Sequence, residues 1–134
     1  MTGDVRVGIV LVSHSSALAA GTAELAGQIG GGSVAIVPAG GTDDGAIGTS
    51  IAKVRSAIVA ASGGAGVLVL PDLGSSVLTV RALLAEPGDL PEPVVLADAP
   101  FVEGAVAAAV AATVGGDIKA VLAAAEEARH ARKL

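Results

Sequence analysis

His14 follows directly on an apolar run that ends at Val12, and it lies among serines in the stretch Ser-His-Ser-Ser. An imidazole ordinarily has a pKa of about 6.5, so in its neutral form it serves as a nucleophile or a base at neutral pH. We expect a helix to begin near Ser15 or Ser16, which would place a group attached to the ring beside free N–H groups that favour an anion. The stretch therefore predicts a histidine that carries a phosphoryl group. A histidine that only forms local hydrogen bonds at a helix start is the alternative.

Asp72 is the predicted partner of His14. It ends the third apolar run, and in the common order of such sheets the third strand neighbours the first. Its carboxylate would accept a hydrogen bond from one ring nitrogen, select the tautomer and leave the other nitrogen free to react. Alternatively, Asp72 only begins the turn Asp-Leu-Gly, which is a common role of aspartate.

Other polar residues that follow the predicted strands would surround this pair. Gly41 and Thr42 belong to a glycine-rich segment, 40–45, that would let the backbone approach a phosphate or a partner. The loops after the strands contain no Lys or Arg, so we expect N–H groups and serine hydroxyls to hold the phosphoryl group. The serines in question are Ser15, Ser16, Ser75 and Ser76. A loosely held phosphohistidine keeps its transfer potential, so a phosphoryl carrier fits this pattern better than a phosphate-hydrolysing enzyme.

Acidic side chains in the same loops bear on the kind of partner. They are Asp43, Asp44, Asp98 and Glu103. Acids gathered at one edge would attract a partner with a basic face and guide its docking.

The elements that would position these residues alternate between short strands and longer helices. Four runs rich in Val, Ile and Leu are typical of parallel strands covered on both faces: 6–12, 34–37, 67–70 and 94–96. Helical spacing follows, first at Leu18, Leu25 and Ile29, then over 47–58 and 77–84. A fourth helix is expected over 101–114, and Asp117 would cap a fifth. The alternation predicts an α/β fold of three layers, a doubly wound parallel sheet with helices on both faces.

The composition fits a single domain, 1–134, with a charged tail at about 126–134. With 8 Lys plus Arg against 13 Asp plus Glu, the formal charge is -5, so nucleic acid is not expected as a partner. The mean hydropathy is +0.74, but Gly, Pro or a charge interrupts the apolar runs before about 18 residues, so no membrane insertion is expected. The absence of cysteine and of a signal peptide at the start indicates the cytoplasm.

Several other classes of protein need residues that the sequence lacks. A receiver-type switch requires an acidic pair after its first strand, and a flavodoxin requires aromatic side chains, of which Phe101 is the only one here. A serine hydrolase requires Gly-x-Ser-x-Gly, which is absent. One histidine with scattered carboxylates is no metal-ligand set, and His130 is expected on the surface of the last helix. We therefore expect no metal or cofactor on this chain.

Four stretches of the sequence carry a resemblance to a known family. They are GIVLVSHSSALAAGTAELAGQI, GGTDDGAIGTSIAKV, VLVLPDLGSSVLTVRALL and ADAPFVEGAVAAAVAA. Together they resemble the mannose-type enzyme IIA family and, within it, the phosphotransfer subunits of dihydroxyacetone kinases that depend on the phosphotransferase system. The resemblance covers nearly the whole chain, and its narrower part rests on the second and fourth stretches.

The resemblance implies a four-stranded sheet in the order 2-1-3-4 and a homodimer. It implies that His14 receives its phosphoryl group from the carrier protein HPr and that Asp72 lies beside His14, while the family's serine maps to Ser75 or Ser76. The acceptor would be ADP, with Mg, on the nucleotide-binding subunit of dihydroxyacetone kinase. The chain stops at Leu134 without the carrier domains that follow in some relatives, so the donor is expected to be a separate protein.

Two alternatives stay open at this point. One is the enzyme IIA of a mannose-type sugar transporter, which would pass the phosphoryl group to a IIB protein. The other is a regulatory module, in which phosphorylation of His14 only changes the affinity for a partner.

Overall fold

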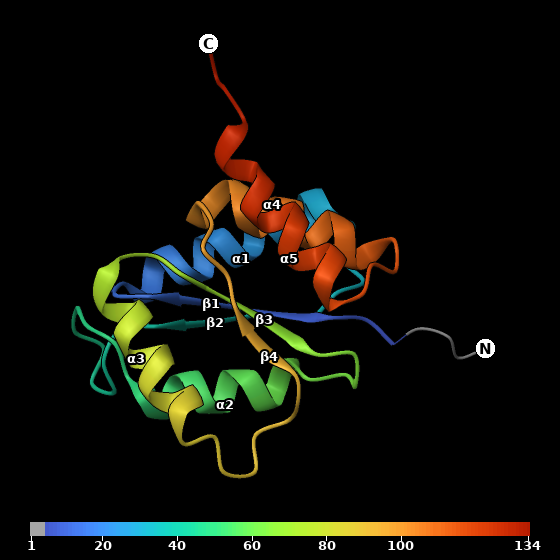
Figure 1. The fold of residues 1–134 in the computed structure, drawn as a ribbon. Coiled ribbons are helices and arrows are strands. Elements are labelled where there is room, and N and C mark those ends of the chain that lie inside the picture. The colour runs from blue at the N-terminus through green and yellow to red at the C-terminus, as the bar shows by residue number, and fades with distance from the viewer. Residues whose placement is uncertain (1–4) are drawn as a thin grey trace.

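The computed structural model describes residues 5–134 (Figure 1). The first four residues, part of the start that we interpret as lacking a signal peptide, lie outside this range. The elements in chain order are β1 (Gly8–Ser13), α1 (Ser16–Gly30), β2 (Ile36–Gly40), α2 (Ile51–Ala61), β3 (Val67–Pro71), α3 (Gly74–Ala85), β4 (Val94–Leu96), α4 (Phe101–Thr113), α5 (Ile118–Glu127) and a short 3-10 helix, η1 (Ala128–His130). Within the described residues no helix combines the length and the apolar character that crossing a membrane requires.

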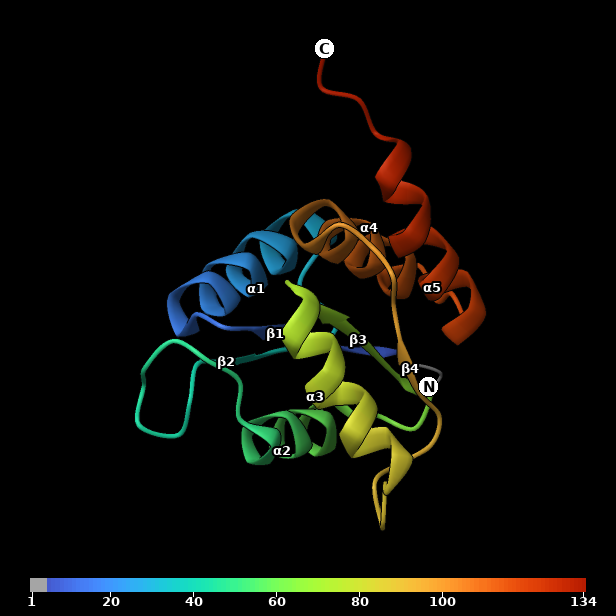
Figure 2. The ribbon, with the colours of Figure 1, turned by 60° about the vertical axis from the view of Figure 1, so that its left-hand side comes forward.

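The four strands form one parallel sheet in the order β2-β1-β3-β4, which confirms the predicted fold class and strand order. Helices α1, α4 and α5 cover one face of the sheet, and α2 and α3 cover the other (Figures 1 and 2). Since β1 pairs with both β2 and β3, the strand order reverses beside the carboxyl end of β1. Sheets of this kind bind ligands at such a point.

The alternation of side chains along β1 divides the core in two. Ile9 and Leu11 pack with the helices on the α4 side, while Val10 and Val12 pack against α2 and α3. All four side chains are fully buried. A run that is apolar at every position is therefore required, because both faces of this strand are covered.

Helix α1 forms where predicted, but its large apolar residues do not face the core. Leu18, Leu25 and Ile29 are 43%, 42% and 58% exposed, and the buried positions are small ones such as Ala19 and Ala26. The reason is the close approach of α1 to α4, where a Cβ added at Gly30 would lie 2.6 Å from the Cβ of Ala109. Large side chains do not fit between helices at that separation.

Strand β2 begins and ends later than the predicted 34–37. Its register pairs Ile9 with Ile36 and Ser13 with Gly40, so the strand runs through Pro38. Proline is tolerated here because β2 is an edge strand and one of its sides needs no N–H donors. This extension brings the glycine-rich segment to the same edge of the sheet as His14.

Candidate functional site

His14 lies between the end of β1 at Ser13 and the start of α1 at Ser16. Ser15 caps α1, because its hydroxyl accepts a hydrogen bond from the Leu18 N–H at 3.1 Å. The His14 backbone is held on both sides: its N–H donates to Asp72 Oδ2 at 3.0 Å, and its carbonyl accepts from the Gly48 N–H at 2.9 Å. The position of the ring is therefore set by groups from three separate loops.

The His14 ring lies between an acid and a hydroxyl. Nδ1 is 2.9 Å from Asp72 Oδ1, and Nε2 forms a hydrogen bond with the hydroxyl of Ser75. The His14 side chain is 20% exposed and that of Asp72 only 6%. An ionised carboxylate only accepts hydrogen bonds, so the proton of the neutral ring belongs on Nδ1 and the lone pair on Nε2. If the neutral ring acts as a nucleophile, the atom that carries the lone pair is therefore Nε2, which faces Ser75.

Asp72 is kept ionised by the hydrogen bonds that it accepts. Burial acts to raise the pKa of Asp72, but hydrogen bonds from the His14 N–H, the Ser13 hydroxyl, the His14 ring and the Ser76 hydroxyl outweigh burial and lower the pKa to about 2. The Leu73 N–H adds a further bond to Oδ1 at 2.7 Å. The carboxylate therefore remains a hydrogen-bond acceptor throughout the neutral pH range.

The structure separates the two serines to which the resemblance maps the family's serine. Ser75 is exposed, and its hydroxyl forms a hydrogen bond with Nε2 of His14. Ser76 is fully buried, and its hydroxyl lies 3.0 Å from Asp72 Oδ1 and 2.9 Å from the Leu73 carbonyl oxygen. Ser75 can therefore contact a group bound to His14, whereas Ser76 only forms a hydrogen bond with the Asp72 carboxylate.

Helix α3 begins beside Nε2 without a side-chain cap. Leu73 stands at its N-cap and makes no side-chain hydrogen bond to the helix, unlike Ser15 in α1. The first N–H groups of α3, on Gly74 and Ser75, have no hydrogen-bond partner within the described part of the chain. Such N–H groups and the helix dipole favour an anion at this position.

The glycine-rich segment at the end of β2 packs against the backbone on both sides of His14. A Cβ at Gly40 would lie 2.5 Å from the Ser15 carbonyl oxygen, so β2 touches the start of α1 directly. The Gly41 N–H donates to the Ser13 carbonyl at 3.1 Å and the Thr42 N–H to the Ala46 carbonyl at 2.9 Å. Gly41 and Thr42 therefore shape the loop with their N–H groups, and their predicted contact with a phosphoryl group or a partner stays a prediction.

Each of the four acidic side chains in the loops accepts a hydrogen bond or forms an ion pair that the sequence did not predict. The Ser50 hydroxyl donates to Asp43, and the Thr42 hydroxyl donates to Asp44 and lowers the pKa of that carboxyl. Asp98 and Glu103 form ion pairs with cations of the C-terminal segment, at 3.4 Å to Arg129 and 3.0 Å to Lys133. The edge therefore carries charges of both signs rather than the uniformly acidic surface that we expected.

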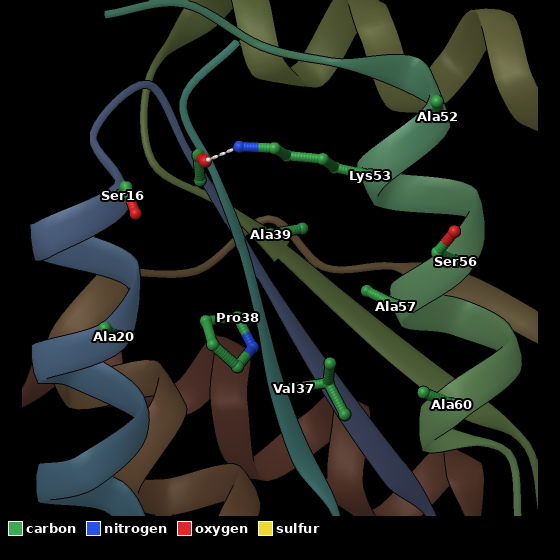
Figure 3. Close-up of a pocket in the computed structure, with 11 residues that line it drawn as sticks. Ser16, Ala20, Val37, Pro38, Ala39, Ala52, Lys53, Ser56, Ala57 and Ala60 are labelled. Carbon is green, nitrogen blue, oxygen red and sulfur yellow. Dashed lines mark hydrogen bonds between the residues drawn. The ribbon is translucent and has the colours of Figure 1, made fainter. Parts of the chain in front are cut away.

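Two cations from helices also reach this edge, although none lies in the loops. Figure 3 shows a groove of about 520 Å³ between α1 and α2, over β2, where Lys53 extends to the Gly40 carbonyl oxygen at 3.1 Å. Arg81 lines a second cleft of about 420 Å³, together with Asp72 and Asp98. The residues that line the groove in Figure 3 include no histidine or acid, so His14 and Asp72 lie outside it.

Two contributors to the site were not identified from the sequence. Ser13, which is fully buried, donates to Asp72 Oδ2 at 2.9 Å and accepts from the Ser15 N–H at 3.0 Å. Lys53 is the other. A polar residue at the last position of a buried central strand was a usable signal for Ser13, whereas nothing in the sequence linked Lys53 to the end of β2.

The parallel sheet and the histidine at its switch point define an α/β protein of the enzyme IIA type. The model of the EIIA-man family, described as "PTS system fructose IIA component", matches residues 8–122, and the chain belongs to this family.

Curated relatives agree with this membership. The chain is 39% identical over 132 residues to the "PEP-dependent dihydroxyacetone kinase, phosphoryl donor subunit DhaM" of Providencia stuartii, covering 95% of this chain but only 28% of that protein. It is 35% identical over 117 residues to the "PEP-dependent dihydroxyacetone kinase 2, phosphoryl donor subunit DhaM" of Listeria innocua, covering 87% of this chain and 94% of that protein. The crystal structure of EF1359, a protein described as of unknown function, superposes with a TM-score of 0.79 at 35% identity and covers 91% of this chain and 94% of that one.

Proposed function

We propose that this chain is a phosphohistidine carrier that acts as the phosphoryl donor subunit of a PEP-dependent dihydroxyacetone kinase. The observation that carries the proposal is the His14 ring, with Nδ1 on Asp72 and Nε2 facing Ser75 at an uncapped helix start. The similarity to two DhaM subunits supports the choice of kinase. The donor would be phosphorylated HPr, and the acceptor would be ADP with Mg on the nucleotide-binding subunit of the kinase. The role fits a cytoplasmic homodimer without a cofactor of its own.

Phosphorylation in this proposal is an in-line displacement at Nε2. The Nε2 lone pair attacks the phosphorus of the donor phosphohistidine, the new N–P bond forms as the old one breaks, and the electrons of the broken bond return to the donor ring. The phosphorylated ring keeps its proton on Nδ1 and is cationic, so the Asp72 carboxylate, 2.9 Å away, stabilises the charge. The Ser75 hydroxyl and the free N–H groups of α3 would donate to the phosphoryl oxygens.

Transfer to the acceptor reverses the roles of the same groups. A phosphate oxygen of ADP attacks the phosphorus, and the electrons of the N–P bond return to Nε2. His14 leaves as a neutral imidazole that is still bonded to Asp72 through Nδ1. No proton has to leave Nδ1 in either direction, which explains why a strongly ionised aspartate suits this position.

The proposal is tested by incubating the chain with labelled PEP, enzyme I and HPr, and then adding ADP-loaded kinase subunit. We expect acid-labile label on the wild-type chain and on His130→Ala, none on His14→Ala, and release of the label to the kinase. Label on His14→Ala would overturn the assignment of the site.

The chain's family is that of the fructose IIA component of the PTS, and this membership favours a second candidate, the enzyme IIA of a sugar transporter. In that case the label on His14 would pass to a IIB protein and not to ADP on the kinase subunit. A regulatory module would pass it to neither.

A further inference from the structure

The groove between α1 and α2 is open because the side chains on both of its walls are small. Ala20 lines it from α1, Ala57 and Ala60 line it from α2, and β2 forms its floor (Figure 3). Its volume of about 520 Å³ lies within the range of sites that bind small organic molecules. The groove is separate from the site described above, because neither His14 nor Asp72 lines it.

The exposed edge of β2 does not suit an added strand. The Gly41 N–H donates to the Ser13 carbonyl of β1, so the alternation along a parallel strand turns the backbone groups of residues 38 and 40 away from β1. Pro38 has no N–H to donate there, and the Gly40 carbonyl already accepts a hydrogen bond from Lys53 Nζ at 3.1 Å. A peptide, or β2 of a second copy, would therefore lack hydrogen bonds at both positions.

Lys53 is the one charged residue among those that line the groove, and it is half-buried. It forms no ion pair with any residue of the described chain. The pKa of Asp44 is lowered first by the hydrogen bond from Thr42 and only last by the charge of Lys53. An ammonium has three N–H donors, of which the Gly40 carbonyl takes one. Two donors and the positive charge are therefore available to an anion in the groove.

Most of the remaining lining of the groove is apolar. Val37, Pro38 and Ala39 follow one another along β2, below the end of Lys53 in Figure 3, and alanines of α1 and α2 face them from both sides. The lining residues include no carboxylate that would repel an anion. The groove thus has a cationic group at one end and an apolar surface along its length.

We propose that the groove binds a small organic monoanion, with its carboxylate on Lys53 Nζ and its apolar chain along β2 between α1 and α2. A single ammonium matches a single negative charge, and each CH2 group that is buried strengthens binding about fourfold. A phosphate dianion would leave the apolar lining without a contact. The inference does not depend on the proposed function, because the anion contacts neither His14 nor Asp72.

Titration of the whole chain with hexanoate, followed by nitrogen-15 NMR, tests the proposal. We expect the N–H resonances of Gly40 and Ser16, which both line the groove, to shift with a Kd on the order of 1 mM, as for other ligands of this size. 1-Hexanol lacks the charge and acetate lacks the apolar chain, so each should bind at least about tenfold more weakly. Absence of these shifts up to about 50 mM hexanoate would overturn the proposal. Equal affinity for hexanoate and either of the other two compounds would do the same.

Substitutions in the groove test where the anion lies. Lys53→Gln removes the charge, and Ala60→Leu fills the groove from an exposed position of α2, so each should raise the Kd for hexanoate about tenfold or more. Ala20→Leu, which fills the groove from α1, should have the same effect as Ala60→Leu. The matched controls are Lys119→Gln and Ala123→Leu, at exposed positions of α5 on the other face of the sheet, and both should retain the wild-type Kd.

The same spectra show whether each variant is folded and which resonances move. A wild-type Kd in Lys53→Gln, or in both leucine variants, would overturn the placement of the anion in the groove. Shifts confined to His14 and Ser75 would place the anion at the phosphoryl site and would also overturn the proposal. Labelling of His14 through HPr is measured separately, so failure of this proposal and failure of the proposed function are distinguishable.

Discussion

At the scale of single residues, Asp72 has the most partners in the site. It accepts hydrogen bonds from the Ser13 and Ser76 hydroxyls, from the His14 and Leu73 N–H groups, and from the His14 ring. An amide at this position would present an NH2 group to donors that need an acceptor. Asp72 therefore stabilises this edge of the sheet and also selects the tautomer of His14.

Asp72→Asn should lower the free energy of unfolding in a pH-dependent way. The fall in the pKa of Asp72 from 3.8 to about 2 on folding corresponds to about 2 kcal/mol. Because the pKa is lowered in the folded state, this stability is present above pH 3.8 and is lost as the pH falls towards 2. Urea unfolding at pH 7 and at lower pH should therefore show a difference between variant and wild type that narrows below about pH 4. A difference independent of pH would contradict the ionised role of Asp72.

Ser75→Ala should slow transfer to and from His14 while the affinity for the donor is preserved. Its hydroxyl faces Nε2 and would donate to the phosphoryl group, and loss of one such donor costs about 10- to 100-fold in rate. Rapid-quench measurement of labelling should show this loss with a KM for HPr within about twofold of wild type. Ser56→Ala, on the exposed side of α2, is the control and should leave the rate unchanged. Equal rates for the two variants would exclude Ser75 from the transfer step.

At the scale of elements, the close approach of β2 to the start of α1 sets where His14 lies. Gly40 contacts the Ser15 and Ser16 backbone with no room for a Cβ, and the loop that follows β2 donates from Gly48 to His14. The apolar pattern did not predict this contact, because Pro38 and Gly40 are turn residues in most contexts. Pro38 is tolerated within β2 because β2 is an edge strand.

Two glycine-to-alanine substitutions should have opposite effects on stability, one through a steric clash and the other through helix propensity. In Gly40→Ala the new Cβ would meet backbone atoms, with the Ser15 oxygen at 2.5 Å, so we expect a loss of about 1–3 kcal/mol and slower phosphorylation of His14. Gly27, inside α1, has nothing within 4 Å of its Cβ position, so Gly27→Ala should stabilise the protein by about 0.5–1 kcal/mol without changing the rate. Thermal unfolding of both variants checks the signs. Destabilisation by Gly27→Ala would show that α1 does not tolerate a methyl group there.

At the scale of the whole molecule, the sequence was sufficient for the fold because β1 over residues 9–12 and β3 are continuously apolar and alternate with helical segments. It was also sufficient to bring His14 and Asp72 together, since both follow neighbouring parallel strands. It was insufficient where packing overrides hydrophobicity, as in α1, whose leucines face outward because α4 approaches too closely. The partners of the acidic residues were also missed, since Arg129 and Lys133 reach Asp98 and Glu103 from a distant part of the chain.

The nitrogen of His14 that carries the phosphoryl group can be identified by nitrogen-15 and phosphorus-31 NMR of the chain after phosphorylation through HPr. Because the Asp72 carboxylate accepts a hydrogen bond from Nδ1, we expect phosphorus to be coupled to Nε2 of His14. Nδ1 should still carry its proton in the same spectrum. Phosphorus coupled to Nδ1, or to any residue other than His14, would refute the proposed role of the Asp72–His14 pair.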